Sequence, residues 1–169
     1  MNPQIDNDPV HRLERLTEIA QYDLFSDDVR SELDDLAHKA ADRFGQDYGM
    51  VSIVLDGAQY FAGRYGTDGW IDAAEGTPVE WAFCANVVRN REAYIVTDAT
   101  VDPLQHDNPL VTQDGIRCYA GVPITAANGE VLGAYCVVGQ TPHDFTAAEI
   151  GELRHMADDV VAVLEQHRM

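Results

Sequence analysis

Two tight-turn signals, each set between apolar segments of strand length, constrain the fold of this 169-residue chain more than any other feature. They are the dipeptides Asp56-Gly57 and Asn128-Gly129. Such dipeptides supply the positive φ angles that a short hairpin turn requires. The flanking segments are residues 49–55, 58–62, 116–124 and 131–138. The chain is therefore expected to contain two β-hairpins, and much of its sheet is expected to be antiparallel.

Apolar residues recur at helical spacing outside these hairpins. The strongest helix start is a capping box, in which Thr146 is the N-cap and Glu149 follows three residues later. A second, weaker start places Thr77 at an N-cap and Pro78 in the first turn. The expected helices are residues 10–20, 27–44, 77–90 and 147–167.

The remaining segments complete a single layered domain. Residues 93–97 are expected to form a further strand, and residues 63–76 and 98–114 to form loops. A length of 169 residues suits one domain, which we place at residues 9–169 after a disordered tail over residues 1–8. Terminal helices combined with a largely antiparallel sheet indicate an α+β fold.

The charge of the chain excludes several classes of partner. Eleven Lys and Arg residues face 29 Asp and Glu residues, which gives a formal net charge of -18. Such a surface repels phosphate backbones and anionic lipid, so neither nucleic acid nor a membrane surface is expected as a partner. No apolar run approaches the roughly 20 residues of a membrane helix. Three widely spaced cysteines and the lack of a signal-peptide core predict a reducing, cytoplasmic location.

Short motifs between Trp81 and Val138 carry a family resemblance. The most specific is the run Tyr119-Ala120-Gly121-Val122-Pro123, followed by a strand pair that contains Gly129 and Gly133. This stretch resembles the GAF domain family, and the order of helices and strands extends the resemblance over about residues 10–167. Further matching segments are Phe83-Cys84-Ala85, Ile95-Val96-Thr97-Asp98, Asp107-Asn108-Pro109-Leu110-Val111 and Phe145-Thr146-Ala147-Ala148-Glu149.

The resemblance implies a central, mostly antiparallel sheet of five or six strands with terminal helices packed on one face. In this family a short helix and loops cover the other face and often enclose a small ligand. Members sense cyclic nucleotides, tetrapyrroles, haem, oxo-acids or amino-acid-like molecules, and the fold alone does not choose among them. The resemblance therefore predicts a non-catalytic sensing or partner-binding module. We expect it to form a homodimer through the helices at residues 10–20 and 147–167.

A ligand pocket of this kind is mostly apolar with a few placed polar groups. The candidate residues are Trp70, Trp81, Phe83, Cys84, Asp98, Asn108, Arg117, Tyr119 and Tyr135. Each also has a purely structural interpretation. The aromatic side chains can pack in the core, Asp98 and Asn108 can cap turns, and Arg117 can pair with a surface carboxylate.

The sequence favours neither a metal nor a covalently attached bilin. The six histidines are scattered, and the chain lacks a Cys-x-x-Cys or His-Glu-x-x-His motif, so we expect no metal site. Phytochrome-type members of the family attach bilin through a Cys-His pair, whereas the cysteines here precede Ala85, Tyr119 and Val137. The only lysine, Lys39, is followed by alanine, so the cyclic-nucleotide signature of phosphodiesterase members is missing.

Two alternative functions remain open from the sequence. One is a thiol-based reductase, because the free methionine sulfoxide reductases resemble this chain in being single GAF domains with several cysteines. Its candidate pair is Cys84 and Cys118, although Cys118 lies inside a predicted strand, unlike the attacking cysteine of that family. The other is a structural dimerisation domain whose pocket is filled by its own aromatic side chains. Taken singly, each cysteine is better explained as a small buried hydrophobic residue.

Overall fold

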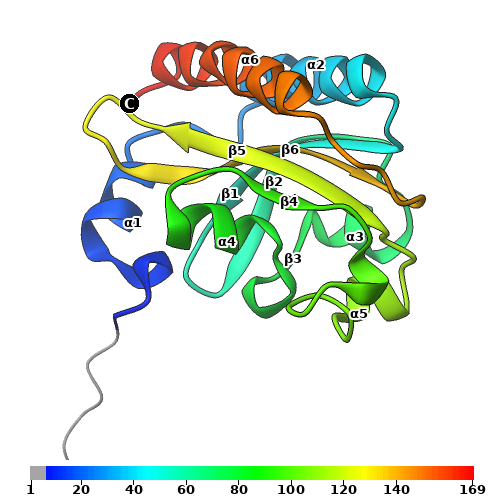
Figure 1. Cartoon of the computed structure of the whole chain (residues 1–169). Helices are drawn as coiled ribbons and strands as arrows, with labels where there is room; N and C mark the ends of the chain where they lie inside the picture. Colours follow the sequence, from blue (N-terminus) through cyan, green and yellow to red (C-terminus); the bar gives the residue numbers. More distant parts are fainter. Residues whose placement is uncertain (1–6) are drawn as a thin grey trace, which may run out of the picture.

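Residues 7–169, which the computed structural model describes, are built around a six-stranded sheet (Figure 1). The strands are β1 (Tyr48–Val54), β2 (Ala58–Tyr65), β3 (Gly76–Pro78), β4 (Tyr94–Val96), β5 (Cys118–Thr125) and β6 (Val131–Gly139). They lie in the order β3-β2-β1-β6-β5-β4, and neighbouring strands are antiparallel throughout. Strands β1 with β2 and β5 with β6 form the two expected hairpins, which are confirmed together with the α+β fold.

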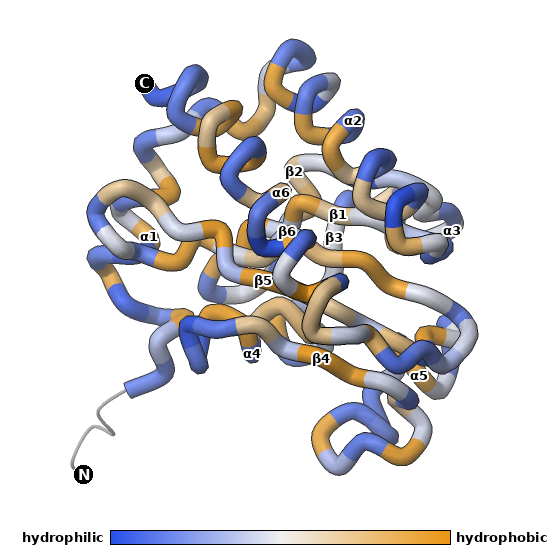
Figure 2. Tube along the Cα trace, turned by 45° about the horizontal axis from the view of Figure 1, so that its top comes forward, coloured by the Kyte–Doolittle hydropathy of each residue, from blue (hydrophilic) through white to orange (hydrophobic). Residues whose placement is uncertain are grey.

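Two long helices, α2 (Asp27–Phe44) and α6 (Ala147–Gln166), lie side by side on one face of the sheet (Figure 1). Hydrophobic and hydrophilic residues alternate along both helices, as an amphipathic layer requires (Figure 2). Helix α2 ends at Gly45, whose φ of 63° places it in the left-handed conformation that glycine adopts without strain. Helix α6 begins with the predicted capping box of Thr146 and Glu149. Both long helices are thus confirmed within a residue at each end.

Short elements cover the other face of the sheet. They are α3 (Gly69–Ala74), α4 (Cys84–Asn90), α5 (Pro109–Thr112) and the 3-10 turns η2 (Val79–Trp81) and η3 (Ala99–Val101). Between them and the sheet lies a second apolar core, separate from the one under the two long helices. This second core contains the cavity described below.

The segment from residue 63 to residue 90 differs from the sequence expectation. Strand β2 continues to Tyr65, and α3 and the start of β3 occupy the expected loop. The helix expected over residues 77–90 begins only at Cys84. The reason is that Thr77 belongs to β3 and its hydroxyl accepts a hydrogen bond from the Gln59 amide, so it does not cap a helix.

The other expected loop, residues 98–114, contains η3 and α5. Asp98 and Asn108 serve as the N-caps of these turns and accept hydrogen bonds from the backbone N–H groups of Thr100 and Leu110. The capping interpretation of both residues therefore describes their structural role.

The two faces of the sheet follow the predicted alternation in β5 but not throughout β6. Cys118, Ala120 and Val122 face the long helices, and Tyr119 faces the second core. In β6 the register against β5 shifts between Ile124 and Thr125. Because of this irregularity Leu132 packs under the helices, whereas Ala134, Cys136 and Val138 face the second core. Ile116 precedes β5 and joins the second core.

The N-terminal segment packs at one end of the sheet. The helix expected over residues 10–20 divides into η1 (Pro9–His11) and α1 (Leu13–Ile19), which lies beside the ends of β5 and β6 and apart from α2 and α6 (Figure 1). Of the tail expected over residues 1–8, residues 1–6 lie outside the described residues. Asp8 caps η1 and forms an ion pair with Arg89 at 3.1 Å.

Candidate functional site

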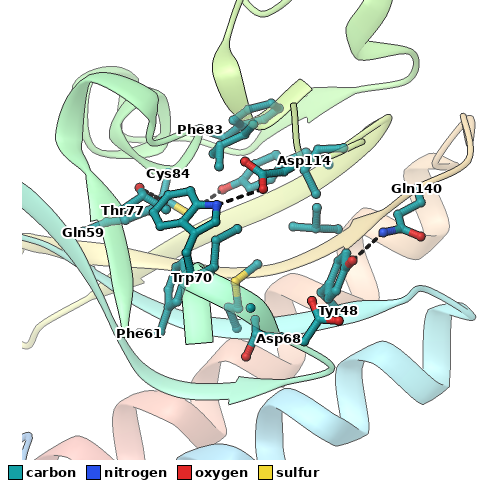
Figure 3. Close-up of a pocket in the computed structure, with 18 residues that line it drawn as sticks. Tyr48, Gln59, Phe61, Asp68, Trp70, Thr77, Phe83, Cys84, Asp114 and Gln140 are labelled. Atoms are coloured by element: carbon teal, nitrogen blue, oxygen red, sulfur yellow. Dashed lines mark hydrogen bonds between the residues drawn. The ribbon is translucent and has the colours of Figure 1, made fainter. Parts of the chain in front are cut away.

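A cavity of about 160 Å³ lies between the sheet and the short elements that cover its second face (Figure 3). Its volume is comparable with the roughly 150 Å³ cavities that accommodate a benzene molecule. The aromatic and aliphatic lining residues are Tyr48, Met50, Phe61, Trp70, Ile71, Phe83, Leu110, Ile116, Tyr119 and Val138. The remaining lining residues are Gln59, Thr67, Asp68, Gly69, Thr77, Cys84, Asp114 and Gln140. The wall is thus largely apolar, with a small number of polar groups.

Alternate residues of four strands point into the cavity and form its wall on the sheet side. Met50, Phe61, Tyr119 and Val138 come from four different strands, and each belongs to the apolar core on this face. Ring packing holds Tyr119 in place, since its centroid lies 5.3 Å from that of Phe83. The sheet side is therefore formed by buried side chains with little room to move.

Hydrogen bonds join neighbouring segments at the open side of the cavity. Trp70 extends across it, and its indole Nε1 donates to Oδ1 of Asp114 at 2.9 Å (Figure 3). The Gln140 amide donates to the hydroxyl of Tyr48 at 2.6 Å. Trp70 remains 41% exposed and packs edge-on against Trp81, with 5.8 Å between ring centroids. A partly exposed indole and its carboxylate partner thus cover a cavity whose sheet side is buried.

A polar chain runs along one wall of the cavity. Ser52 donates to Oε1 of Gln59 at 2.9 Å, and Nε2 of Gln59 donates to the hydroxyl of Thr77 at 2.7 Å. The Thr77 hydroxyl in turn donates to the carbonyl of Pro78 at 3.0 Å. These groups satisfy one another, as buried polar groups must, and still present amide and hydroxyl edges to the cavity.

Two thiols and a phenol form a cluster at the bottom of the cavity. The sulfur atoms of Cys84 and Cys136 lie 3.8 Å apart, and the Tyr119 hydroxyl donates to the Cys84 sulfur at 3.0 Å. The three side chains, which we call the thiol cluster, are buried, and Cys84 and Tyr119 line the cavity. Gly121 leaves the room that Tyr119 occupies, because a Cβ atom there would overlap the phenol.

The thiol cluster shifts the acidity of its members in opposite directions. Burial disfavours the Cys84 thiolate, but hydrogen bonds from Cys136 and Tyr119 outweigh burial and lower the pKa of Cys84. The pKa of Cys136 is raised by its hydrogen bond to Cys84 and by burial. The pKa of Tyr119 is raised by burial and by the neighbouring sulfurs. Within the cluster, Cys84 is therefore the thiol that ionises most readily.

Four of the residues singled out from the sequence line the cavity together: Trp70, Phe83, Cys84 and Tyr119. Two others stand just outside it. Trp81 supports Trp70 from behind, and the side chain of Asn108 donates to the Trp81 carbonyl at 3.1 Å.

The other candidates are corrected by the structure. Asp98 is exposed and caps η3, away from the cavity. Among the described residues, Arg117 neither lines the cavity nor pairs with a carboxylate, and its guanidinium donates to the carbonyls of Val111 and Ile116, each at 2.9 Å. Tyr135 packs on the opposite face of the sheet and donates to the carbonyl of Leu36, because successive strand residues point to opposite sides.

The cysteine pair expected for a thiol-based reductase is also wrong. Cys118 lies under the long helices and donates to the side-chain oxygen of Gln46 at 3.3 Å, on the face opposite Cys84. Burial raises the pKa of Cys118 to about 11. The residue close to Cys84 is instead Cys136.

Several lining residues were not predicted. Met50 follows the strand alternation of residues 49–55, so that pattern contained a usable signal. Asp114 and Gln140 lie in connections after α5 and β6, where sequence periodicity gives no indication of which side chains converge.

Within residues 7–169, no group of three or more His, Cys, Asp or Glu side chains is arranged to hold a metal ion. None of their helices combines the length and the apolarity needed to cross a membrane.

Comparison with known families matches residues 26–165 to the GAF domain model. The chain belongs to the GAF domain family. As a GAF domain, it is 30% identical over 146 residues to a cyclic di-GMP phosphodiesterase of Pseudomonas aeruginosa. That match covers 85% of this chain and 24% of the relative, so this GAF domain spans about a quarter of the relative's length.

Solved structures agree with the GAF fold at low sequence identity. A type II free methionine-R-sulfoxide reductase from Thermoplasma acidophilum aligns with a TM-score of 0.68 at 14% identity, covering 87% of this chain and 99% of that one. The GAF domain of an Acinetobacter phosphoenolpyruvate-protein phosphotransferase gives a TM-score of 0.67 at 15% identity, covering 98% and 95%. At such identities these likenesses concern the fold alone.

Proposed function

We propose that this GAF domain is a sensor module that binds one small ligand in the cavity beneath Trp70 and does not catalyse a reaction on it. The observation that carries the proposal is the cavity itself. A concave, largely apolar wall with a few convergent polar groups is typical of small-molecule sites. The best supported contact residues are Trp70, Phe83, Cys84 and Tyr119, together with Gln59 and Thr77.

The charge of the lining restricts the ligand. Asp68 and Asp114 are the charged residues on the wall, and none of the described lining residues is basic. An anionic ligand would lose its hydration here without gaining a counter-charge. The proposed ligand is therefore neutral or cationic and has an apolar body about the size of one aromatic ring. Cyclic di-GMP, with two phosphates, does not fit this description.

The module is proposed to act as a homodimer through residues 10–20 and 147–167. The Arg168 guanidinium, just after α6, donates to Glu18 of α1 at 2.7 Å and so links the two segments within one chain. Leu13 is 73% exposed on α1, which leaves an apolar residue for a partner. Light scattering that gives a strict monomer at high protein concentration would exclude this surface.

Native mass spectrometry of the protein purified from its own cells tests ligand binding. We expect a stoichiometric extra mass that leaves on denaturation. The variant Val138→Phe fills the cavity from the sheet side and should lose this mass, whereas Val101→Phe adds the same side chain at a site that is 75% exposed and should keep it. A protein that carries no extra mass and keeps the same thermal stability with 10 mM indole or phenol would instead favour a structural dimerisation domain.

A further inference from the structure

Two of the three cysteines are held together at the bottom of the cavity, and the third is not. The Cys84 and Cys136 sulfurs are separated by 3.8 Å, which is van der Waals contact. A disulfide requires about 2.05 Å, so closing the bond needs an approach of roughly 1.8 Å. Cys84 is the first residue of α4 and Cys136 lies in β6, so closing the bond brings the start of this helix and the strand closer together. Cys118 lies on the other side of the sheet and is separated from both by β5 and β6 themselves.

The cavity gives a small molecule a route to one of these sulfurs. Cys84 is 3% exposed to bulk solvent but lines the cavity, whereas Cys136 lies behind it and is fully buried. The Tyr119 hydroxyl donates to the Cys84 sulfur and stabilises a thiolate there. A thiolate is the nucleophilic form of cysteine. Cys84 therefore has the position of an attacking thiol, and Cys136 that of a resolving thiol.

We propose that Cys84 and Cys136 form a redox site that a small hydroperoxide entering the cavity oxidises to an intramolecular disulfide. The Cys84 thiolate attacks one peroxide oxygen, the O–O bond breaks, and Cys84 becomes a sulfenic acid while the second oxygen leaves as water after taking up a proton. The Cys136 thiol then attacks the Cys84 sulfur, the S–O bond breaks, and a second water leaves. In total two thiols and hydrogen peroxide give one disulfide and two waters. An external dithiol reverses the change by thiol–disulfide exchange.

Oxidation at this site changes the cavity. Cys84 is the first residue of α4 and follows Phe83, another lining residue, so drawing Cys84 towards β6 moves part of the wall. It also converts the Cys84 sulfur that accepts the Tyr119 hydrogen bond into a disulfide sulfur, which is a weaker acceptor than a thiolate. The reaction goes beyond ligand binding and does not depend on it, because the thiol cluster is present whether or not the cavity holds a ligand.

The test is to treat the reduced full chain with hydrogen peroxide under native conditions, alkylate the remaining thiols in denaturant, and map the peptides without reduction. We expect the loss of two hydrogen atoms in mass, a Cys84–Cys136 linkage, and alkylation of Cys118. Cys118 is an internal control, since global unfolding exposes all three thiols, whereas entry through the cavity reaches Cys84. Three free thiols after excess peroxide, or oxidation at Cys118 or between chains, would overturn the proposal.

Variants separate the roles of the residues. Cys136→Ala should stop the reaction at a sulfenic acid on Cys84, which dimedone traps. Tyr119→Phe keeps the ring and removes the donor, and should slow disulfide formation about tenfold. Cys118→Ala should react like the wild type. An unchanged rate in Tyr119→Phe would refute the role of the phenol, and dimedone labelling of Cys118 in place of Cys84 would refute the assignment of the attacking thiol.

Discussion

The indole nitrogen of Trp70 lies 2.9 Å from Oδ1 of Asp114, and this hydrogen bond spans the opening of the cavity (Figure 3). Helix α3, which carries Trp70, has no buried residues. It is held from one side by Asp72, which accepts hydrogen bonds from Arg64 at 2.8 Å and Thr67 at 2.9 Å. The Trp70–Asp114 contact therefore fixes the part of α3 that covers the cavity.

Replacing Asp114 with alanine should loosen this cover without unfolding the domain. In a Trp81→Phe background, where Trp70 is the remaining tryptophan, its emission should shift to longer wavelength and its quenching by acrylamide should increase. The free energy of unfolding should change by about 1 kcal/mol or less, because the contact is exposed. Asp107→Ala removes an exposed carboxylate from the connection before α5 and should leave the Trp70 emission unchanged. An equal response of both variants would show that the hydrogen bond does not hold Trp70.

Gly121 should tolerate no side chain, because a Cβ atom there would overlap the Tyr119 phenol. Gly121→Ala is expected to lower the free energy of unfolding by about 1–3 kcal/mol, as overpacking of a core does, and to displace Tyr119 from Cys84. The matched control is Gly151→Ala in α6, where a Cβ atom meets nothing within 4 Å. That change should raise stability by about 0.5–1 kcal/mol through helix propensity. Urea unfolding of the two variants measures both effects, and equal stability of the two would contradict the packing argument.

The parts of the fold that could be predicted from sequence are those determined locally. The start of α6 depends on Thr146 and Glu149, which lie within one four-residue segment. The end of α2 depends on Gly45 alone. The same kind of signal failed at Thr77, because a distant amide, that of Gln59, binds its hydroxyl and β2 pairs with its backbone. A local capping preference does not reveal that a residue distant in the sequence binds the same hydroxyl group.

The candidate site was predicted only in part for a related reason. Residue type and the family resemblance identified Trp70, Phe83, Cys84 and Tyr119, which the fold brings to one cavity. Tyr135 was misplaced because strand alternation shows which residues share a face of the sheet but not which face meets the cavity. The approach of Cys136 to Cys84 depends on where α4 begins, and no sequence pattern specified that position.

Arg15 should be essential for attaching the N-terminal segment. It is 2% exposed, and its guanidinium donates to the carbonyls of Val10, Val131 and Leu132, while its Nε has no hydrogen-bond partner within residues 7–169. Burial lowers the pKa of Arg15 to about 10, so it remains charged at neutral pH. Arg15→Met removes the hydrogen bonds to three backbone carbonyls and should cost about 2–4 kcal/mol in the free energy of unfolding. Arg12→Met removes a neighbouring half-exposed arginine paired with Glu130 and should cost less than about 1 kcal/mol. Comparable losses in the two variants would argue against a special role for Arg15.

Glu18 should make the stability of the domain depend on pH in the acid range. Hydrogen bonds from Arg168 at 2.7 Å, Tyr22 at 2.9 Å and Asn128 at 3.0 Å lower its pKa below the ordinary value of 4.5. A carboxyl with a depressed folded-state pKa stabilises the fold above its unfolded pKa, and this contribution is lost as the pH falls through the folded value. The difference in unfolding free energy between wild type and Glu18→Gln should thus be largest above about pH 5.5 and shrink towards pH 3.

The stability of Glu18→Gln has to be compared with that of the wild type at each pH, because acid also reduces the repulsion among the 29 acidic residues. This general effect acts on both proteins alike. The control is Glu14→Gln on the same helix, whose carboxylate is 72% exposed and forms only a 3.9 Å pair with Arg12. Its difference from wild type should stay near zero throughout the range. Urea unfolding at pH 7, 5 and 3.5 measures both differences. A Glu18→Gln difference that stayed constant or grew on acidification would mean that the carboxylate of Glu18 is not preferentially ionised in the folded protein.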